Sequence, residues 1–339
     1  MSSDSVRVGA VGCGYWGPNV IRNLDALDGF QLRTICDADP GRLNAVASRH
    51  PAARPTTRVQ EVLEDASIDA VYLATPVSTH YELAKQALVS GKHVLLEKPL
   101  ATRVEQAEEL ATLAAERRLV LLVGHTFVFS PPVRKVKDLI VGGQVGPIYY
   151  IETTRVNLGL FQKDVSVLWD LGPHDLSILL YWLEEVPMAV SARGRAFHGD
   201  TLEDVAFLTL EFPSGILAQI QLSWLAPSKL RRTSIVGRQR MIVYDDLEPV
   251  EKVKVYDRGV DRQPASFGEF QLTYRSGDIL SPRLDTTEPL QLECAHWLEC
   301  IRTGREPDVR PQSAVDVVRV IQAAERSLRQ HGAPQAVTS

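Results

Sequence analysis

Several features that would place the chain in a specialised class are scarce in its 339 residues. The four cysteines form neither a CxxC pair nor a Cys/His spacing suited to zinc, so we expect reduced thiols and no metal site. No apolar run approaches the ~20 residues of a membrane span. The first residues lack the charged and apolar regions of a secretory signal. We therefore expect a cytoplasmic protein that does not bind membranes.

An excess of charge of one sign is also missing. The chain has 37 Lys and Arg against 42 Asp and Glu, a formal net charge of −5, and its basic residues are scattered. This balance gives no reason to expect nucleic acid or an anionic membrane as a partner. The apolar content of 45% is ordinary for a globular protein, and the length suits about two domains.

The first part of the chain alternates between apolar strands and helices. Strands are expected at residues 6–11, 31–36, 54–57, 69–75, 93–97 and 119–124, with helices at 17–27, 40–50, 80–90 and 104–118. Strands this apolar, separated by helices, are typical of a parallel sheet covered on both faces. We predict an α/β fold with a doubly wound Rossmann domain over residues 1–124.

The remaining residues, 125–339, show alternating strand patterns with helices before and after them. We predict an α+β domain with a large open, mostly antiparallel sheet of about six strands between residues 147 and 257. The helices after residue 288 either belong to this domain or pack against the first one. Runs such as 205–212 and 216–225 carry apolar residues on both faces, which favours a homodimer or homotetramer formed through the open sheet.

A glycine-rich loop, GCGYWG, lies between the first strand and the first helix and contains Gly12, Gly14 and Gly17. In this context the three glycines allow a tight turn, close approach of a pyrophosphate and close helix packing. Asp37 ends the second strand, where an acid binds the adenosine ribose hydroxyls and would repel a 2′-phosphate. The pattern predicts a dinucleotide site that prefers NAD to NADP.

Two further segments place polar side chains where chemistry could occur. Lys98 follows a predicted strand and precedes Pro99, at the edge where parallel sheets bind ligands. The stretch WDLGPHD places Asp170 and His174 four residues apart, on one side of a helical turn. Because Gly172 and Pro173 interrupt the pattern, Asp170 lies either just before the helix or within it. Asp175 either accepts a substrate hydroxyl or begins the helix.

Taken together, GCGYWG, EKP and DLGPHD resemble the glucose–fructose oxidoreductase/inositol dehydrogenase (Gfo/Idh/MocA) family. The resemblance implies an NAD- or NADP-binding first domain and a second domain with a large open sheet. It also implies that Lys98, Asp170 and His174 act at the reacting hydroxyl. Stretches such as RVNLG and ECAHWLECI are most similar to the nucleotide-sugar 3-dehydrogenase subgroup.

These observations define three sets of candidate residues, which are catalytic, cofactor-binding and substrate-binding. The candidate catalytic residues are Lys98, His174 and Asp170. The candidate cofactor-binding residues are Gly12, Gly14, Tyr15, Trp16, Gly17, Asp37, Thr75, Pro76, His80, Glu97 and Lys98. The candidate substrate-binding residues are Lys98, His125, Arg155, Asn157, Asp170 and His174. His296 is expected in a helix core.

The resemblance predicts an NAD-dependent oxidoreductase that oxidises the C3 hydroxyl of a UDP-hexose. A histidine side chain titrates near neutral pH, so His174 suits the accompanying proton transfer. Three alternatives stay open: a ketoreductase of deoxysugar biosynthesis, a dehydrogenase of a free sugar or inositol, and a dinucleotide-binding regulator without activity. Retention of Lys98, Asp170 and His174 argues against the regulator.

Overall fold

The computed structural model describes residues 5–159, 161, 165–199, 202–264 and 270–338. The chain divides into two compact units. The first consists of residues 1–130 and 287–318, and the second of residues 131–286 and 319–339. Each unit therefore contains a segment from the last part of the chain.

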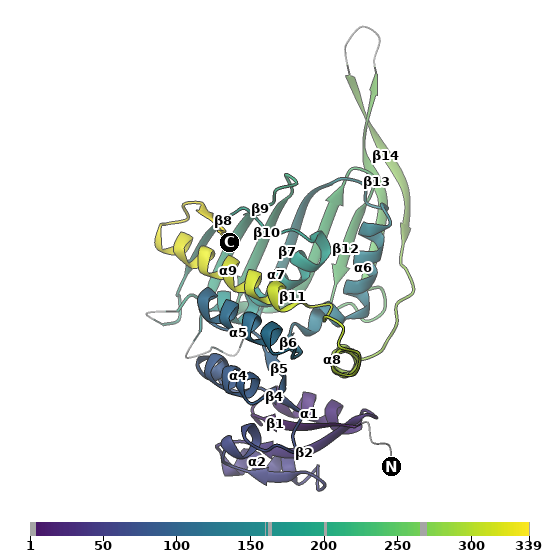
Figure 1. Ribbon diagram of the computed structural model, residues 1–339. Helices are drawn as coiled ribbons and strands as arrows, with labels where there is room; N and C mark the ends of the chain where they lie inside the picture. Colours follow the sequence, from purple (N-terminus) through teal and green to yellow (C-terminus); the bar gives the residue numbers. More distant parts are fainter. Residues whose placement is uncertain (1–4, 160, 162–164, 200–201, 265–269, 339) are drawn as a thin grey trace. The chain divides into compact units, whose positions relative to one another are not determined.

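A six-stranded parallel sheet forms the centre of the first unit (Figure 1). Its order is β3-β2-β1-β4-β5-β6, which is the arrangement of dinucleotide-binding folds and confirms the predicted doubly wound sheet. The strands are β1 (Val6–Val11), β2 (Phe30–Cys36), β3 (Arg54–Thr56), β4 (Ala70–Leu73), β5 (His93–Glu97) and β6 (Leu121–Gly124). Residues such as Val8, Leu73 and Leu96 are completely buried, as expected for central strands with both faces covered.

Helices and short 3₁₀ turns connect these strands. They are α1 (Gly17–Ala26), α2 (Pro40–Ala47), α3 (Gln60–Leu63), η1 (Val77–Thr79), α4 (His80–Val89), α5 (Val104–Glu116) and η2 (Thr126–Phe129). Helix α8 (Pro289–Thr303) also belongs to this unit, where it contacts α1 and η2. Helix α9 (Pro311–Arg329) begins in the first unit and ends in the second.

The second unit is built on a nine-stranded sheet in the order β14-β13-β12-β11-β7-β10-β9-β8-β15. Strands β7 and β10 are parallel, and the other neighbouring pairs are antiparallel. The strands are β7 (Ile148–Leu158), β8 (Ala189–Arg195), β9 (Val205–Glu211), β10 (Leu217–Ser223), β11 (Leu225–Gly237), β12 (Met241–Asp245), β13 (Val253–Pro264), β14 (Phe270–Leu280) and β15 (Gln335–Ala336). The mostly antiparallel sheet was predicted, but its extent was not.

The sequence prediction missed β14, β15 and the second half of β13. Figure 1 shows β13 and β14 continuing as a two-stranded arm past the neighbouring strands. Apolar alternation predicted only the start of β13, as far as residue 257. The rest of β13 is mostly polar, and β14 alternates only over its first residues, FQLTY, so neither was predicted. Strand β11 begins earlier than expected because it continues through Pro227, where its pairing with β7 is irregular.

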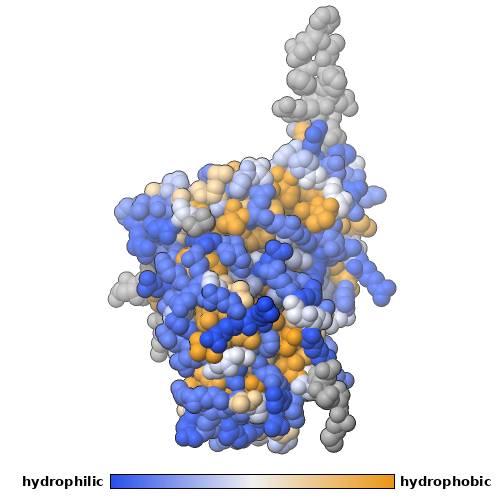
Figure 2. Space-filling model, in the orientation of Figure 1, coloured by the Kyte–Doolittle hydropathy of each residue, from blue (hydrophilic) through white to orange (hydrophobic). Residues whose placement is uncertain are grey.

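One face of this sheet carries helices. Helix α7 (Val167–Leu183) packs on β7, β9 and β10, and α6 (Pro131–Val141) packs on β12 and α7. Along β9, Ala206 and Leu208 are buried while Phe207 and Thr209 are exposed. The exposed positions of β9 thus mix apolar and polar side chains. Figure 2, which views the molecule from the side on which α6 and α7 lie, shows apolar and polar side chains mixed on that surface as well.

Helix α7 begins at Val167, before the stretch WDLGPHD whose helix boundary the sequence left open. Ser166 is its N-cap, so Asp170 lies in the first turn, and Gly172 and Pro173 lie inside the helix. The alternative with Asp170 outside the helix is therefore wrong. Asp175 does not begin the helix either, because it lies in the interior of α7 and is buried.

Asp175 is part of a polar cluster between α7 and the sheet. The Nε of Arg155, on β7, donates to Asp175 at 2.6 Å, and the hydroxyl of Thr153 donates to the same carboxylate at 2.9 Å. Thr233 on β11 contacts Thr153 at 3.2 Å. Arg155 and Asp175 are almost fully buried, so the ion pair fixes α7 at one position along β7.

Replacing Arg155 by methionine is predicted to destabilise the second unit. The change leaves the Asp175 charge buried and without its main donor, which costs about 3–5 kcal/mol of the free energy of unfolding. Urea unfolding of the purified protein measures this loss. The double replacement Arg155→Met with Asp175→Leu should recover most of it, because it removes both charges.

Arg231→Met is the matched control, because the Arg231–Asp246 pair is partly exposed. We expect a loss of about 1 kcal/mol or less for this pair. If Arg155→Met cost no more than Arg231→Met, the buried pair would not be the element that holds α7 in place.

Candidate active site

The loop between β1 and α1 can be built only with glycine at two positions. Gly12 has φ +103°, and a Cβ atom there would collide with the carbonyl oxygen of Ala74. A Cβ at Gly17 would collide with the carbonyl oxygen of Gly12. Around Gly14 the space is open, and the first N–H groups of α1 follow. The loop and helix start therefore have the geometry that binds a pyrophosphate.

Asp37 stands directly after β2 and stabilises this loop. Its carboxylate accepts the N–H of Cys13 at 2.6 Å and the N–H of Asp39 at 2.8 Å. Each carboxylate oxygen keeps a further lone pair, and the side chain is only partly buried. Asp37 can therefore accept ribose hydroxyls while it holds the glycine loop. Tyr15 and Trp16 in the loop are exposed, which leaves them accessible to a ligand.

A second loop of the carboxyl edge follows β4 and contains Thr75 and Pro76. The ring of His80 is buried and connects this loop to the next one: its nitrogens lie 2.9 Å from the carbonyl oxygen of Thr75 and 2.8 Å from that of Pro99. Thr79 donates to the hydroxyl of Thr75 at 2.7 Å. The structure thus places His80 as a link between two loops of the candidate cofactor site.

Lys98 follows β5 at the same edge and is partly exposed. The preceding Glu97 accepts a hydrogen bond from the hydroxyl of Tyr72, on β4, at 2.9 Å. The protein packed around this carboxyl raises its pKa to about 7, against the opposing effects of the Tyr72 hydrogen bond and the Lys98 charge. Lys98 is therefore a cation beside an acid that titrates near neutrality.

His125 lies just after β6 and is buried. Burial, together with the positive charge of Lys98, lowers the pKa of its imidazole to about 3, so the ring is neutral. Neither ring nitrogen has a hydrogen-bond partner among the residues that the structure describes. A neutral imidazole close to Lys98 could contact a ligand hydroxyl, and this role for His125 stays a prediction.

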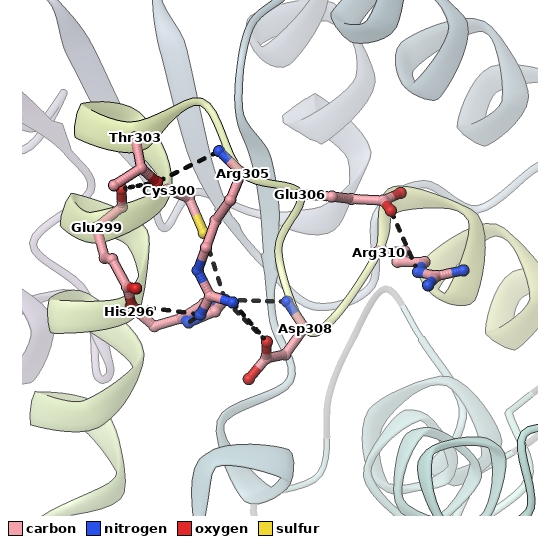
Figure 3. A network of polar contacts seen from close by, with 8 residues as sticks. All are labelled: His296, Glu299, Cys300, Thr303, Arg305, Glu306, Asp308 and Arg310. Atoms are coloured by element: carbon pink, nitrogen blue, oxygen red, sulfur yellow. Dashed lines mark hydrogen bonds and ion pairs between the residues drawn. The ribbon is translucent and has the colours of Figure 1, made fainter.

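His296 occupies a different environment, on α8. Its ring nitrogens lie 2.8 Å from a guanidinium nitrogen of Arg305 and 3.0 Å from the backbone nitrogen of Asp308, as Figure 3 shows. The ring also packs against Phe129, with centroids 5.2 Å apart. These contacts fasten the end of α8 to the loop that follows it. His296 is a structural residue rather than part of the edge that carries Lys98.

In the second unit, Asp170 and His174 lie one turn apart on α7, and both are partly exposed. The indole N–H of Trp224, which follows β10, donates to Asp170 at 3.1 Å. Trp224 is almost completely buried, so its ring is a fixed support for the carboxylate. The helix thus presents a carboxylate and an imidazole side by side, as the spacing of four predicts.

Two other candidate substrate residues lie on β7. Asn157 is partly exposed near the end of the strand. Arg155 is buried, and its guanidinium is bonded to Asp175. Asp175 is likewise held in the interior, so this structure does not present it to a ligand. Direct substrate contact by Arg155 or Asn157 stays a prediction.

The sequence interpretation overlooked the partners that hold these groups. Tyr72 carries the only polar side-chain atom of the strand AVYL, and a buried tyrosine hydroxyl needs a partner. Glu293 shares the buried face of α8 with Leu290 and Trp297, so the helical spacing of these apolar residues could have shown that the acid is buried. Trp224 carried no comparable signal, because an aromatic residue after a strand is ordinary.

The fold and these side chains define a nicotinamide-dependent oxidoreductase. The chain belongs to the GFO/IDH/MocA oxidoreductase family. Residues 6–125 match the family's model "Oxidoreductase family, NAD-binding Rossmann fold", and residues 133–243 match the "GFO/IDH/MocA C-terminal domain". The resemblance inferred from the motifs and the expected NAD cofactor are confirmed.

Several characterised proteins are similar over most of their length. The UDP-N-acetylglucosamine 3-dehydrogenase of Acidithiobacillus ferrooxidans is 30% identical over 262 residues, which cover 76% of this chain and 79% of the relative. The scyllo-inositol 2-dehydrogenase (NAD(+)) of Bacillus subtilis is 29% identical, covering 96% and 94%. The structure of GenD2 from gentamicin A biosynthesis, in complex with NAD, superposes with a TM-score of 0.83 at 25% identity, covering 100% of this chain and 98% of that one.

Among the described residues, no helix combines the length and apolar character needed to cross a membrane. The same part of the chain contains no group of three or more His, Cys, Asp or Glu side chains arranged to hold a metal ion.

The position of Asp37 predicts a preference for NAD(H) over NADP(H). Its carboxylate would face the 2′-phosphate of NADP, and Ala38 offers no cation to balance it. Titration of the purified protein with each dinucleotide should give the tighter dissociation constant for NAD(H). Asp37→Ala should weaken NAD binding and narrow the preference.

Asp39→Asn serves as the control for the Asp37 replacement. It removes a neighbouring charge but keeps an oxygen to cap α2. We expect its preference for NAD to resemble that of the parent. Tighter binding of NADP(H) than of NAD(H) by the parent protein would contradict the role of Asp37.

Proposed function

We propose that the protein oxidises a secondary hydroxyl, at C3 of a nucleotide-activated hexose such as a UDP-sugar, and transfers the hydride to NAD. The observation that carries this proposal is the presence, in one chain, of the NAD loop, Lys98 at the carboxyl edge of β5, and Asp170 with His174 on α7. The similarity to a UDP-N-acetylglucosamine 3-dehydrogenase supports the substrate class. A cytoplasmic location is proposed on the four reduced, buried cysteines.

The proposed reaction assigns each side chain a task. Oxidation of an alcohol delivers a hydride to the nicotinamide and a proton to a base. His174 accepts that proton, because an imidazole titrates near neutral pH and can return the proton in the reverse reaction. Lys98 polarises the hydroxyl oxygen. Asp170, held by Trp224, keeps its carboxylate available to orient His174 or a sugar hydroxyl.

A free polyol is the second candidate substrate. The scyllo-inositol 2-dehydrogenase of Bacillus subtilis matches nearly the whole chain at an identity close to that of the sugar-nucleotide enzyme. The same residues would also serve a ketoreductase working in the opposite direction. A panel of UDP-hexoses, free sugars and inositols, followed by nicotinamide absorbance, separates these candidates. Turnover of UDP-N-acetylhexoses above all free polyols is the expected result.

His174→Ala should lower turnover without preventing cofactor binding. The variant loses the proton acceptor while Gly12, Gly14 and Asp37 are unchanged, so turnover should fall by roughly 10²–10⁴. This loss corresponds to about 3–5 kcal/mol of transition-state stabilisation. Steady-state kinetics on the best substrate of the panel, together with an NAD titration, measures both effects.

His198→Ala is the matched control, because His198 also lies in the second unit but is exposed. Its turnover should stay close to that of the parent. A folded His174→Ala protein that turned over within threefold of the parent would show that His174 is not the proton acceptor. Asp170→Asn should be mild if Asp170 only supports α7 and severe if it binds substrate.

We also propose that the protein forms a homodimer or homotetramer through the exposed face of the nine-stranded sheet. Phe207, Leu217 and Tyr150 are exposed on β9, β10 and β7, which are adjacent strands. A bare sheet face with such residues is uncommon on a monomer. Light scattering should give a mass of at least twice 37.6 kDa, and Leu217→Glu should lower it. A single species of the monomer mass for the parent would contradict this assembly.

A further inference from the structure

Glu293 is a carboxyl group in the interior of the first unit that the proposed reaction does not use. It lies on α8, on the face that also presents Leu290 and Trp297, and it is about 1% exposed. A charged side chain is rarely left at such a position without a counter-ion. The surroundings of its two oxygens show how the site accommodates it.

The two carboxyl oxygens of Glu293 are unequally satisfied. Oε2 accepts the hydroxyl of Thr126, from η2, at 2.9 Å. Oε1 is buried and has no hydrogen-bond partner among the described residues. An ionised carboxylate can accept about four hydrogen bonds, and leaving a charged oxygen without a donor is costly. This environment therefore favours the neutral acid.

Glu97 is the acid whose charge acts on Glu293. Glu97 is paired with Gly124 in the register of β5 and β6, and Thr126 follows Gly124 by two residues. A Cβ at Gly124 would lie 3.2 Å from Oε2 of Glu97, so this carboxyl is closely enclosed. Burial first, and then the charge of Glu97, raises the pKa of Glu293 well above its usual range. The two acids are thus close enough for their charges to interact, and among the described residues Lys98 is the cation whose charge acts on Glu97.

We propose that Glu293 is held as a neutral carboxylic acid beside Glu97, so that the pair carries one negative charge, located on Glu97 next to Lys98. Glu293 is then a positioning residue that acts through Glu97: its proton prevents a second negative charge, and the single anion on Glu97 holds the Lys98 side chain in place. The link to catalysis rests on the proposed function of Lys98. The protonation of the pair does not.

The other groups around the pair are consistent with a single negative charge. The pKa values of Tyr72 and Cys294 are raised, first by burial and then by the nearby acids, so both side chains are neutral. His125 is neutral as well, with its pKa lowered to about 3. Arg22, whose charge also acts on Cys294, is paired with Glu288 at 2.6 Å, so among the described neighbours Lys98 is the cation that balances Glu97.

Infrared difference spectroscopy tests where the proton resides. At pH 8, exposed carboxyls are ionised, and Glu97, with a pKa of about 7, is mostly ionised too. The parent-minus-variant spectrum of Glu293→Gln should contain the carbonyl band of a protonated carboxylic acid. The band should remain in the spectrum of Glu97→Gln. It should also remain in the control Glu299→Gln, which changes an exposed acid on α8, the helix that carries Glu293. Absence of the band in the parent, or its loss in Glu97→Gln alone, overturns the proposal.

The pH dependence of stability gives a second readout. An acid whose folded pKa is raised binds a proton in the native state that the unfolded state releases above about pH 4.5. The parent should therefore lose stability relative to Glu293→Gln as pH rises from 4.5 to 8, measured as the urea midpoint. A constant difference across this range contradicts a neutral Glu293. If Glu293→Gln does not fold, the band in the parent and in Glu97→Gln still decides the question.

Turnover connects the pair to Lys98. Glu97→Gln removes the anion beside Lys98 and should lower turnover at least tenfold more than Glu293→Gln, which keeps a neutral side chain. A larger loss of turnover for Glu293→Gln than for Glu97→Gln would indicate that the negative charge lies on Glu293, and would contradict the proposal. If no substrate is found, the proposed function fails, but the infrared and stability experiments still test the protonation of the pair.

Discussion

The close approach of β1 and β4 at the carboxyl edge of the parallel sheet is the constraint on which the candidate cofactor site depends. At that edge Gly12 passes so near the carbonyl of Ala74 that no side chain fits. The tight turn places the N-terminus of α1 over the edge, and Asp37 fixes the turn through the N–H of Cys13. The pyrophosphate site and the ribose acceptor thus follow from one steric condition and one hydrogen bond.

Two chain segments are fixed to their sheets by buried polar groups. In the first unit, the charge of Glu97, at the end of β5, acts on Glu293 on α8. The hydroxyl of Tyr72 donates to Glu97, and that of Thr126 donates to Glu293. In the second unit, the Arg155–Asp175 pair fixes α7 on β7 while Trp224 supports Asp170. Such groups contribute little net stability by themselves. Their effect is to specify where Lys98 and His174 lie within their own units.

Sequence patterns predicted the parts of the fold that apolar periodicity controls. The runs VRVGAV and HVLLE are central strands because both faces of a parallel sheet are covered. Patterns failed where burial does not decide the structure: the second half of β13 is mostly polar, β14 alternates only over its first residues, and β11 continues through Pro227. The candidate residues on motifs could be found, whereas Trp224 and Glu293 depend on contacts between segments far apart in the chain. Arg155 illustrates the converse, because it was a candidate substrate-binding residue and its partner in the structure is Asp175.

The central claim is a direct hydride transfer from the carbon of a sugar hydroxyl to NAD. The most direct measurement uses UDP-N-acetylglucosamine carrying deuterium at C3 and follows the reduced nicotinamide by mass spectrometry. The account predicts that the reduced cofactor carries the deuterium and that kcat/KM is lower than with unlabelled substrate. Reduced cofactor without deuterium, or no reduction by any nucleotide sugar from a protein that binds NAD, would contradict it.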